Sequence, residues 1–397
     1  MHRVLLAVIL AAALAAVAGA PAAQAAGIRR QPDRTWQTNR GVRAIAVDPR
    51  TGVVYVGGVF DAVRPARACP TCASVSRHHL AAFDRHGDLL PWNPGADGPV
   101  LALAFSARNR SVIAGGEFHR AGGRSRAHLA SFAARGGGAL GRWRPNPDGP
   151  VRALAVSRGS LYVGGHFGRI GGRRRANVAA FDLRRGRRPR LLRRFRPHVD
   201  HEVLAIATAH ERVFLGGALR HVNGRSQRHL TALTRRGRVL RFALHPRFRV
   251  HALVASPTGV YVAEGGPRGG FVLARGVRRG RARWRIRLDG DAQALALMRG
   301  RLYVGGHFPN VCGGRGRGHG VPFVCDRPIR RRKLCSVVMR QADASPRRAA
   351  RGVSAWNPNA NSTLGVFALA SWRGRLLVGG DFTRIGGRAQ QGFASFH

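Results

Sequence analysis

The side chains with the most chemical reactivity in this chain are five cysteines. Cys69 and Cys72 form a CxxC pair, Cys312 and Cys325 bracket the stretch CGGRGRGHGVPFVC, and Cys335 lies in KLCSVV. Two cysteines in one loop can form a disulfide, or they can bind zinc together with histidines elsewhere. A single CxxC without a second pair at the proper spacing is a weak zinc motif. We therefore expect no metal site. We also expect Cys335 to be a buried free thiol, because alanine stands at the matching place elsewhere in the chain.

Carboxylates are scarce, which limits acid–base chemistry. Of the 18 acidic residues only four are glutamate, namely Glu117, Glu202, Glu211 and Glu264. Four aspartates recur in similar contexts (ADGPV, PDGPV, VDHEV, LDGDA), namely Asp97, Asp148, Asp200 and Asp289. This recurrence favours a role in turns, and a ring of carboxylates that holds calcium is the alternative. No Ser-His-Asp or Cys-His arrangement is indicated by spacing, so we expect no catalytic residue and no cofactor.

Positive charge is the strongest compositional feature of the chain. Lys and Arg total 68 against 18 Asp and Glu, a formal net charge of +50, and Lys333 is the only lysine. A field of this size attracts polyanions and weakens with salt, and arginine can hold phosphate or carboxylate through two hydrogen bonds. The expected partner is an anionic polymer, an anionic cell-surface component or a protein. Nucleic acid is possible but not favoured, and the alternative is that diffuse charge serves solubility alone.

One short pattern is repeated along the whole chain. It consists of a β-branched or aliphatic run, two glycines, a variable residue and usually Phe, at intervals of about 50 residues. The copies are 54–60 (VYVGGVF), 112–118 (VIAGGEF), 161–167 (LYVGGHF), 213–219 (VFLGGAL), 302–308 (LYVGGHF), 376–382 (LLVGGDF) and a degraded copy at 260–266 (VYVAEGG). The variable position holds Val59, Glu117, His166, Ala218, His307 and Asp381, and so offers potential ligands.

Each copy lies among four short apolar runs, as at 151–157, 161–167, 177–183 and 191–197. Their length and β-branched composition are typical of strands. Four strands repeated seven times predict an all-β fold, a seven-bladed β-propeller of four-stranded antiparallel blades. The last copy has no fourth run, whereas 34–39 (RTWQTN) precedes the first copy as 89–94 (LLPWNP) precedes the second. We therefore expect an N-terminal strand to complete the last blade and remove its open edges.

The extended pattern YVGGxFxxxGGxxRxxLAAFDxxGxLxxWNPxxDGPVxALA resembles the delta-60-type repeats of exported bacterial β-propeller proteins. More distantly, it resembles the repeats of a fungal cortical marker of cell polarity. The resemblance covers nearly all of the chain after its N-terminus. It implies the propeller fold, but it brings no catalytic residues. The stretch LAAFDRHGDLLPW is also similar to a quinoprotein dehydrogenase repeat, although the pair of neighbouring cysteines found in those enzymes is not present.

The N-terminal segment predicts export. Residues 1–25 have a basic start, an apolar core and a small-x-small cleavage site (Ala23-Gln24-Ala25), as a secretory signal peptide does. We expect a short linker at 26–32, a propeller domain at 33–397, and no membrane span once the signal is removed. The protein should be secreted, extracellular or cell-wall associated. An oxidising setting favours the disulfides Cys312–Cys325 and Cys69–Cys72.

Arginines that follow the repeated pattern are the predicted anion-binding residues. Four occupy equivalent positions after GG or NG, namely Arg124, Arg173, Arg225 and Arg388, and the sixth-copy insertion adds Arg315 and Arg317. Rotational repetition would place the four on an arc of one face. A second arginine in each stretch precedes the third strand so regularly that a structural hydrogen bond to a neighbouring turn is its alternative role (Arg77, Arg126, Arg175 and Arg228).

Two function classes follow. The first is an exported, non-catalytic binding or scaffold module for anionic cell-surface or extracellular material, or for a protein partner. The alternative is an extracellular enzyme, a lyase, hydrolase or quinone-dependent dehydrogenase, with a site at the mouth of the propeller channel. The sequence favours the first class, because it shows no clustered carboxylates, metal motif or cofactor motif.

Overall fold

The structure is a computed structural model that describes residues 28–66, 73–184, 186, 188–243, 246–267, 269–308, 311–312, 334–338 and 356–397. In these residues all regular elements are β-strands, and the strands of each sheet pair antiparallel. The prediction of an all-β fold is confirmed. No helix that could cross a membrane occurs in the described part of the chain. The predicted signal peptide and Cys69, Cys72, Cys325, Arg315 and Arg317 lie outside the described residues.

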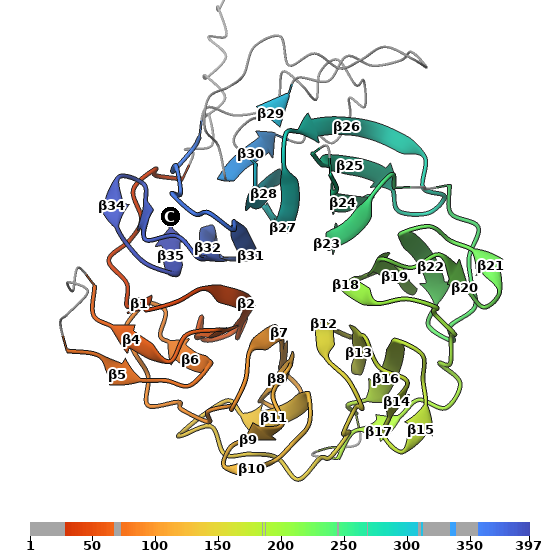
Figure 1. Cartoon of the computed structure of the whole chain (residues 1–397), viewed down its shortest axis with the longest axis horizontal. Helices are drawn as coiled ribbons and strands as arrows, with labels where there is room; N and C mark the ends of the chain where they lie inside the picture. Colours follow the sequence, from red (N-terminus) through yellow and green to blue (C-terminus); the bar gives the residue numbers. More distant parts are fainter. Residues whose placement is uncertain are drawn as a thin grey trace, which may run out of the picture.

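The larger sheets lie side by side around a common centre (Figure 1). Each begins with an innermost strand that contacts the innermost strand of the next sheet, and β31 contacts β2, so the contacts run full circle. These strands are β2 (Val42–Val47), β7 (Val100–Ser106), β12 (Val151–Ser157), β18 (Val203–Ala209), β23 (Arg249–Ala255), β27 (Asp291–Met298) and β31 (Val366–Trp372). We number the sheets one to seven in this order.

Each sheet continues outward through a second and a third strand. The second strands carry the repeated pattern: β3 (Val54–Gly58), β8 (Ser111–Gly116), β13 (Ser160–Gly165), β19 (Arg212–Gly217), β24 (Gly259–Gly265), β28 (Arg301–His307) and β32 (Arg375–Gly380). The third strands are β6 (Leu80–Phe83), β11 (Leu129–Ala133), β16 (Val178–Asp182), β22 (Leu230–Thr234), β25 (Phe271–Gly276), β30 (Leu334–Val338) and β35 (Phe393–Phe396).

The two glycines of the repeated pattern permit close approach of neighbouring backbones. A Cβ atom on Gly115 would lie 2.4 Å from Val151 of the next sheet, and a Cβ on Gly116 would lie 2.1 Å from the carbonyl oxygen of Pro99. Both distances are too short for a real Cβ, so glycine is required. The valine contact recurs around the circle of sheets, including the junction of sheets seven and one: Gly57 with Val100, Gly164 with Val203, Gly216 with Val250, Gly305 with Val366 and Gly379 with Val42.

The contact between the fifth and sixth sheets is made by different residues. Its second strand has Ala263 where the other sheets have the first glycine, and the next innermost strand has Ala292 in place of valine. Both alanines are fully buried in one hydrophobic cluster. A larger residue on one side is therefore matched by a smaller residue on the other, as close packing requires.

Among the described residues, the predicted fourth strand forms a paired strand in two sheets. It is β17 (Arg190–Leu191) in sheet three and β26 (Ala282–Leu288) in sheet five. In sheets one, two and four it is reduced to one backbone bridge, Phe83 with Leu89, Phe132 with Leu140 and Leu233 with Val239. In sheet one, Pro91 follows soon after the bridge, and proline cannot donate to a strand ladder. The expectation of four complete strands is therefore not met in these three sheets.

The N-terminal segment lies against the last strand of the chain. The Arg29 and Asp33 N–H groups donate to the carbonyl oxygens of His397 and Ser395, at 3.0 and 2.8 Å. Residues 28–32, expected to be a linker, are packed here: Ile28 is buried in the core of the seventh sheet, and the Trp356 indole donates to the Arg29 carbonyl. The short strand β1 (Gln37–Thr38) pairs with β4 (Ala62–Arg64) of the first sheet and not with β35.

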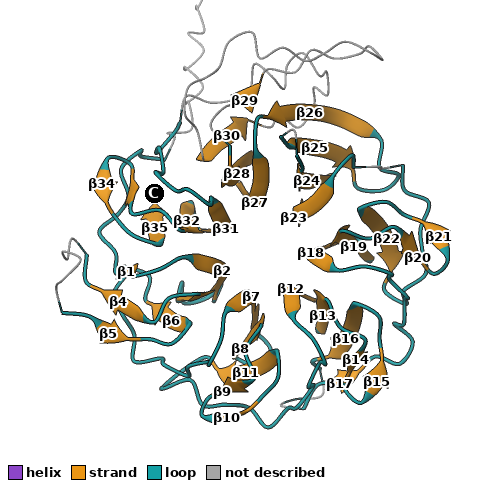
Figure 2. Cartoon of the chain, in the orientation of Figure 1, coloured by secondary structure: helices purple, strands orange, loops and turns teal. Residues whose placement is uncertain are grey.

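Short strands occupy the outer edge of the molecule, between the second and third strands (Figure 2). Pairs of them form hairpins: β4 with β5 (Val75–Ser76), β9 (Arg120–Ala121) with β10 (Arg124–Ser125), β14 (Arg169–Ile170) with β15 (Arg173–Arg174), β20 (His221–Val222) with β21 (Arg225–Ser226), and β33 (Arg384–Ile385) with β34 (Arg388–Ala389). In the sixth repeat, β29 (Val311–Cys312) pairs with β26. These outer hairpins carry the predicted anion-binding arginines.

Candidate functional site

Four of the predicted arginines occupy equivalent places in the outer hairpins. Arg124, Arg173, Arg225 and Arg388 are each the first residue of the outer hairpin strand, in β10, β15, β21 and β34 (Figure 1). The first three belong to the consecutive sheets two, three and four. The structure therefore brings three of them onto neighbouring hairpins, while Arg388 lies on the other side of the first sheet.

An aspartate or asparagine before the innermost strand fixes the base of each hairpin. The Asp97 Oδ1 atom accepts hydrogen bonds from the N–H groups of His119 and Arg120, both at 2.8 Å. Burial alone would raise the pKa of Asp97, but these two N–H donors, together with the Asp97 N–H and the His119 side chain, lower the pKa. The same arrangement recurs at Asp148, Asp200, Asn39 and Asn361. Asp97, Asp148 and Asp200 therefore hold hairpins that lie 20 to 23 residues further along the chain, a different role from the local turn that was predicted.

The arginines of three consecutive hairpins form an exposed set that we name the rim arginines. They are Arg120, Arg124, Arg169, Arg173, Arg174, Arg220, Arg225 and Arg228. None of them has an ion pair with an acidic residue in the part of the chain that the structure describes. The Arg120 guanidinium donates one hydrogen bond to the Gly123 carbonyl, at 3.1 Å. Without acidic partners, the rim arginines keep guanidinium donors available to an anionic ligand.

Arg388 differs from the rim arginines although it occupies the equivalent position. It is half-buried, and its guanidinium donates to the Pro32 carbonyl at 3.2 Å and to the Gln31 side-chain oxygen at 2.7 Å. These bonds tie the seventh hairpin to the N-terminal segment. The structure thus assigns Arg388 an internal role, which the sequence pattern alone did not indicate.

The structural hydrogen bond expected of the second arginine is found at two of the positions. Arg77 and Arg126 are buried and donate to the carbonyl oxygens of Leu90 and Gly141, at 3.1 and 3.2 Å. These acceptors directly follow the bridge residues Leu89 and Leu140 of the reduced fourth strand and do not lie in a turn. Burial lowers the pKa of both arginines. Arg228 is not their equivalent, because Gln227 makes the corresponding backbone bond and Arg228 is exposed. The sequence alignment was one residue out of register at this point.

A second polar site lies at the axis, on the same face as the hairpins. Every innermost strand has a β-bulge at its start, and bulges redirect side chains. The bulged residues are Arg43, Leu101, Arg152, Leu204, His251, Gln293 and Phe367. Residues two and four positions further along β2, β7 and β12 line a hollow near the axis. Each bulged residue is less buried than the residue before it, and in β2 Arg43 shares the less buried side of the strand with Ile45 and Val47, which line the hollow.

Charged residues around this row are joined into one network, which we name the axial cluster. Arg152 lies 3.2 Å from Glu117 and 3.5 Å from Glu202, and Arg249 lies 3.6 Å from Glu202. The axial cluster comprises Arg43, Glu117, Arg152, Glu202, Arg249 and His251. The three ion pairs link sheets two to five, whereas Arg43 belongs to sheet one. The axial cluster contains two of the four glutamates in the chain.

Arg43 and His251 are the partly buried members of the axial cluster. The Arg43 guanidinium lies 3.6 Å from the centre of the Phe367 ring, a cation–π contact between sheets one and seven. Burial lowers the pKa of Arg43, and the Asp381 and Glu117 carboxylates oppose this effect. Burial also lowers the pKa of His251, so its imidazole is neutral at neutral pH.

Beneath the axial cluster, aliphatic side chains of β2, β7 and β12 line the hollow near the axis. One residue in each innermost strand, two positions after the bulge, is Leu or Ile: Ile45, Leu103, Leu154, Ile206, Leu253, Leu295 and Leu369. The hollow that some of them line has a volume of about 360 Å³. The axial cluster thus has an apolar floor.

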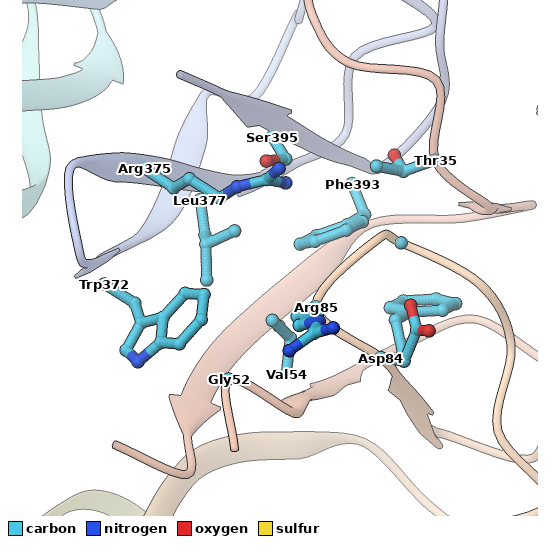
Figure 3. Close-up of a pocket in the computed structure, with 12 residues that line it drawn as sticks. Thr35, Gly52, Val54, Asp84, Arg85, Trp372, Arg375, Leu377, Phe393 and Ser395 are labelled. Carbon is cyan, nitrogen blue, oxygen red and sulfur yellow. The ribbon is translucent and has the colours of Figure 1, made fainter. Parts of the chain in front are cut away.

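A separate crevice lies at the junction of the last and first sheets (Figure 3). Trp372, Leu377 and Phe393 line it on one side, and Val54 and Arg85 on the other. Its volume is about 10 Å³, which is roughly the space of one water molecule. The crevice is too small for an organic ligand, so this junction has a structural role.

The fifth sheet contains an unusual buried carboxyl group. Glu264 occupies the position of the second glycine of the repeated pattern and is 1 % exposed. It accepts a hydrogen bond from the Phe248 N–H at 3.2 Å, and the Arg247 N–H is a second donor. Burial raises its pKa to about 7, against these two donors. This sheet has no outer hairpin among the described residues, and Glu264 fastens the entering chain in place of the aspartate seen elsewhere.

Two of the five cysteines lie in strands that the structure describes. Cys312 lies in β29, opposite Arg287, and Cys335 lies in β30, opposite Val304, while the partners Cys325, Cys69 and Cys72 fall outside the described residues. Both predicted disulfides therefore stay predictions. Within the described ranges, no three His, Cys, Asp or Glu side chains are grouped so that they could hold a metal ion.

The axial cluster was missed from the sequence. Glu117 is recognisable as the variable residue after GG, but its partner Arg152 stands in the next repeat, so spacing within one repeat does not join them. A usable signal is the second residue of each innermost run, which is polar in VRAIAV, VRALAV, VHALVA and AQALAL. A polar residue inside an otherwise apolar run indicates a position that faces the axis.

Comparisons with known proteins give similarity in fold alone. No family model matches the chain, and no curated protein matches it. Among solved structures, the chain is similar to the crystal structure of the computationally designed Ika8 protein, with a TM-score of 0.53 and 13% identity over 92% of this chain and 100% of that chain. At this identity the similarity carries no information on function.

Proposed function

We propose that the protein is an exported, seven-bladed β-propeller that binds anionic polymer of the cell surface or extracellular space through its rim arginines. The full circle of contacts between innermost strands supports the propeller. The glycine–valine packing that joins sheet seven to sheet one, and the bonds between Arg29, Asp33 and the last strand, support its closure. The delta-60-type repeat pattern and the N-terminal sequence support export.

The observation that carries the binding proposal is the set of unpaired rim arginines. They are exposed, they lie on three consecutive hairpins of one face, and none has an ion pair among the described acidic residues. A guanidinium offers a planar pair of donors that fits phosphate or carboxylate. Repetition around the axis suits a polymer that carries a negative charge in each unit, because one chain can contact successive hairpins.

The test exchanges Arg124, Arg173 and Arg225 for serine together. Arg388 is left unchanged, because its bonds to residues 31 and 32 support the fold. The variant should keep the parent's melting temperature, since the three side chains are exposed. It should elute from an immobilised polyphosphate column at lower salt than the parent.

A matched control distinguishes polymer binding at the rim arginines from attraction by the net positive charge of the whole protein. Exchanging Arg50, Arg108 and Arg236 for serine removes the same charge from exposed turns on the opposite face. If the rim arginines bind polymer, the control should elute close to the parent. Equal elution shifts for both triple variants would show that binding is diffuse, and the proposal would then be wrong.

A further inference from the structure

We propose that the axial cluster is a second binding site, for a neutral polyhydroxylated ligand such as one sugar unit of a glycan. The argument rests on its charge balance, its hydrogen-bonding groups and its apolar floor. None of these depends on the rim arginines.

The axial cluster is close to electrically balanced in a protein of formal net charge +50. Arg43, Arg152 and Arg249 face Glu117 and Glu202, and two further carboxylates, Asp291 and Asp381, act on His251 and Arg43. All three ion pairs join residues of different repeats. A site of balanced charge holds no strong preference for an ion of either sign, so it favours a ligand without net charge.

The same groups retain hydrogen-bonding capacity. A guanidinium has five N–H donors and a carboxylate has about four acceptor sites, and the ion pairs use only part of them. Arg152 Nε lies 3.5 Å from Glu202 but makes no hydrogen bond within the described residues. Adjacent donors and acceptors suit the vicinal hydroxyl groups of a sugar, because each hydroxyl both donates and accepts.

Accessibility and depth also fit such a ligand. The side chains of Arg152 and Glu117 are 34% and 41% exposed, so the charged groups can be reached from solvent. Ile45, Leu103 and Leu154, which line the hollow, give an apolar surface on which the C–H face of a sugar ring can rest. Polar groups above an apolar floor are the usual composition of a small-molecule site.

The experiment incubates the full mature protein with an array of neutral oligosaccharides at high salt, where attraction to polyanions is screened. The parent should retain at least one neutral glycan, and binding should be nearly independent of salt. Two variants probe the site: Glu117→Gln, which keeps the side-chain shape, and Arg152→Met, which removes the donors. Each should weaken binding of that glycan by tenfold or more, the effect of losing one or two hydrogen bonds to a charged group.

The control is the rim variant with serine at 124, 173 and 225, which should bind the neutral glycan as the parent does. Melting curves confirm that each variant is folded. Should the folded parent retain no neutral glycan, or should Glu117→Gln and Arg152→Met both bind as the parent does, the axial proposal is overturned. Because the polyphosphate assay probes different residues, either proposal can fail while the other stands.

Discussion

The buried carboxyl group of Glu264 gives the protein a defined dependence of stability on pH. Its folded-state pKa is about 7, raised by burial from an ordinary value of 4.5. A carboxyl whose pKa is higher in the folded state binds its proton more tightly there. Its contribution is therefore fully present below pH 4.5 and is lost as the pH rises to about 7.

The size of this effect follows from the two pKa values. Each unit of difference corresponds to about 1.4 kcal/mol of unfolding free energy, so raising the pH through this window costs about 3 kcal/mol at this one residue. Glu264→Gln removes the titration and keeps the shape and one acceptor for the Phe248 N–H. The free energy of unfolding of the parent, relative to that of Glu264→Gln, should thus fall by about 3 kcal/mol between pH 4.5 and pH 8.

The assay is urea denaturation of both proteins at several pH values, followed by tryptophan fluorescence. Other titrating groups are common to both proteins and cancel in the difference. Glu211→Gln is the control, because Glu211 is exposed on the opposite face and a hydrogen bond from Arg235 lowers its pKa. A difference in unfolding free energy between the parent and Glu264→Gln that does not change with pH would refute the reasoning.

Three further predictions follow from the packing, the chain ends and the cysteines. Gly115→Ala should lower the unfolding free energy by about 1–3 kcal/mol through overpacking. Adding Val151→Ala should recover part of this loss, because the smaller alanine makes room as Ala292 does beside Ala263. No recovery in thermal melts would contradict the contact between the two sheets. Deleting residues 28–38 should cause aggregation or a large loss of thermal stability, and a monomer on size exclusion that melts unchanged would argue against closure by this segment. Non-reducing peptide mapping should find Cys312 linked to Cys325 and Cys69 to Cys72, whereas Cys335 in a bridge to Cys312 would reverse the pairing.

The first three strands of each sheet could be predicted because the same short hydrophobic pattern recurs along the chain. One copy of LYVGGHF fits many strands, but several copies in register identify the second strand and its two close-packed glycines. The fourth strands were harder to predict. They lie at the outer edge, where side-chain packing tolerates a single bridge as in Phe83 with Leu89, and hydrophobic pattern does not report hydrogen bonding.

The positions of the rim arginines could be predicted from the sequence because they repeat. Whether each guanidinium is free of partners within the protein could not be predicted. Arg124 and Arg388 occupy equivalent positions, and only the structure shows that Arg388 is bonded to Pro32 and Gln31. The axial cluster was missed for the opposite reason, since its members differ from sheet to sheet. Contacts such as Arg152 with Glu202 join residues of different repeats, and no spacing rule within one repeat reveals them.

The salt dependence of polyphosphate affinity is the most direct test of the central claim that the rim arginines bind anionic polymer. The logarithm of the association constant, plotted against the logarithm of salt concentration, falls with a slope of slightly under one for each phosphate contact. Exchanging Arg124, Arg173 and Arg225 for serine should make this slope shallower by about 2 to 3. The control with serine at 50, 108 and 236 should leave it nearly unchanged. The same slope in the parent and in the rim variant would contradict the account.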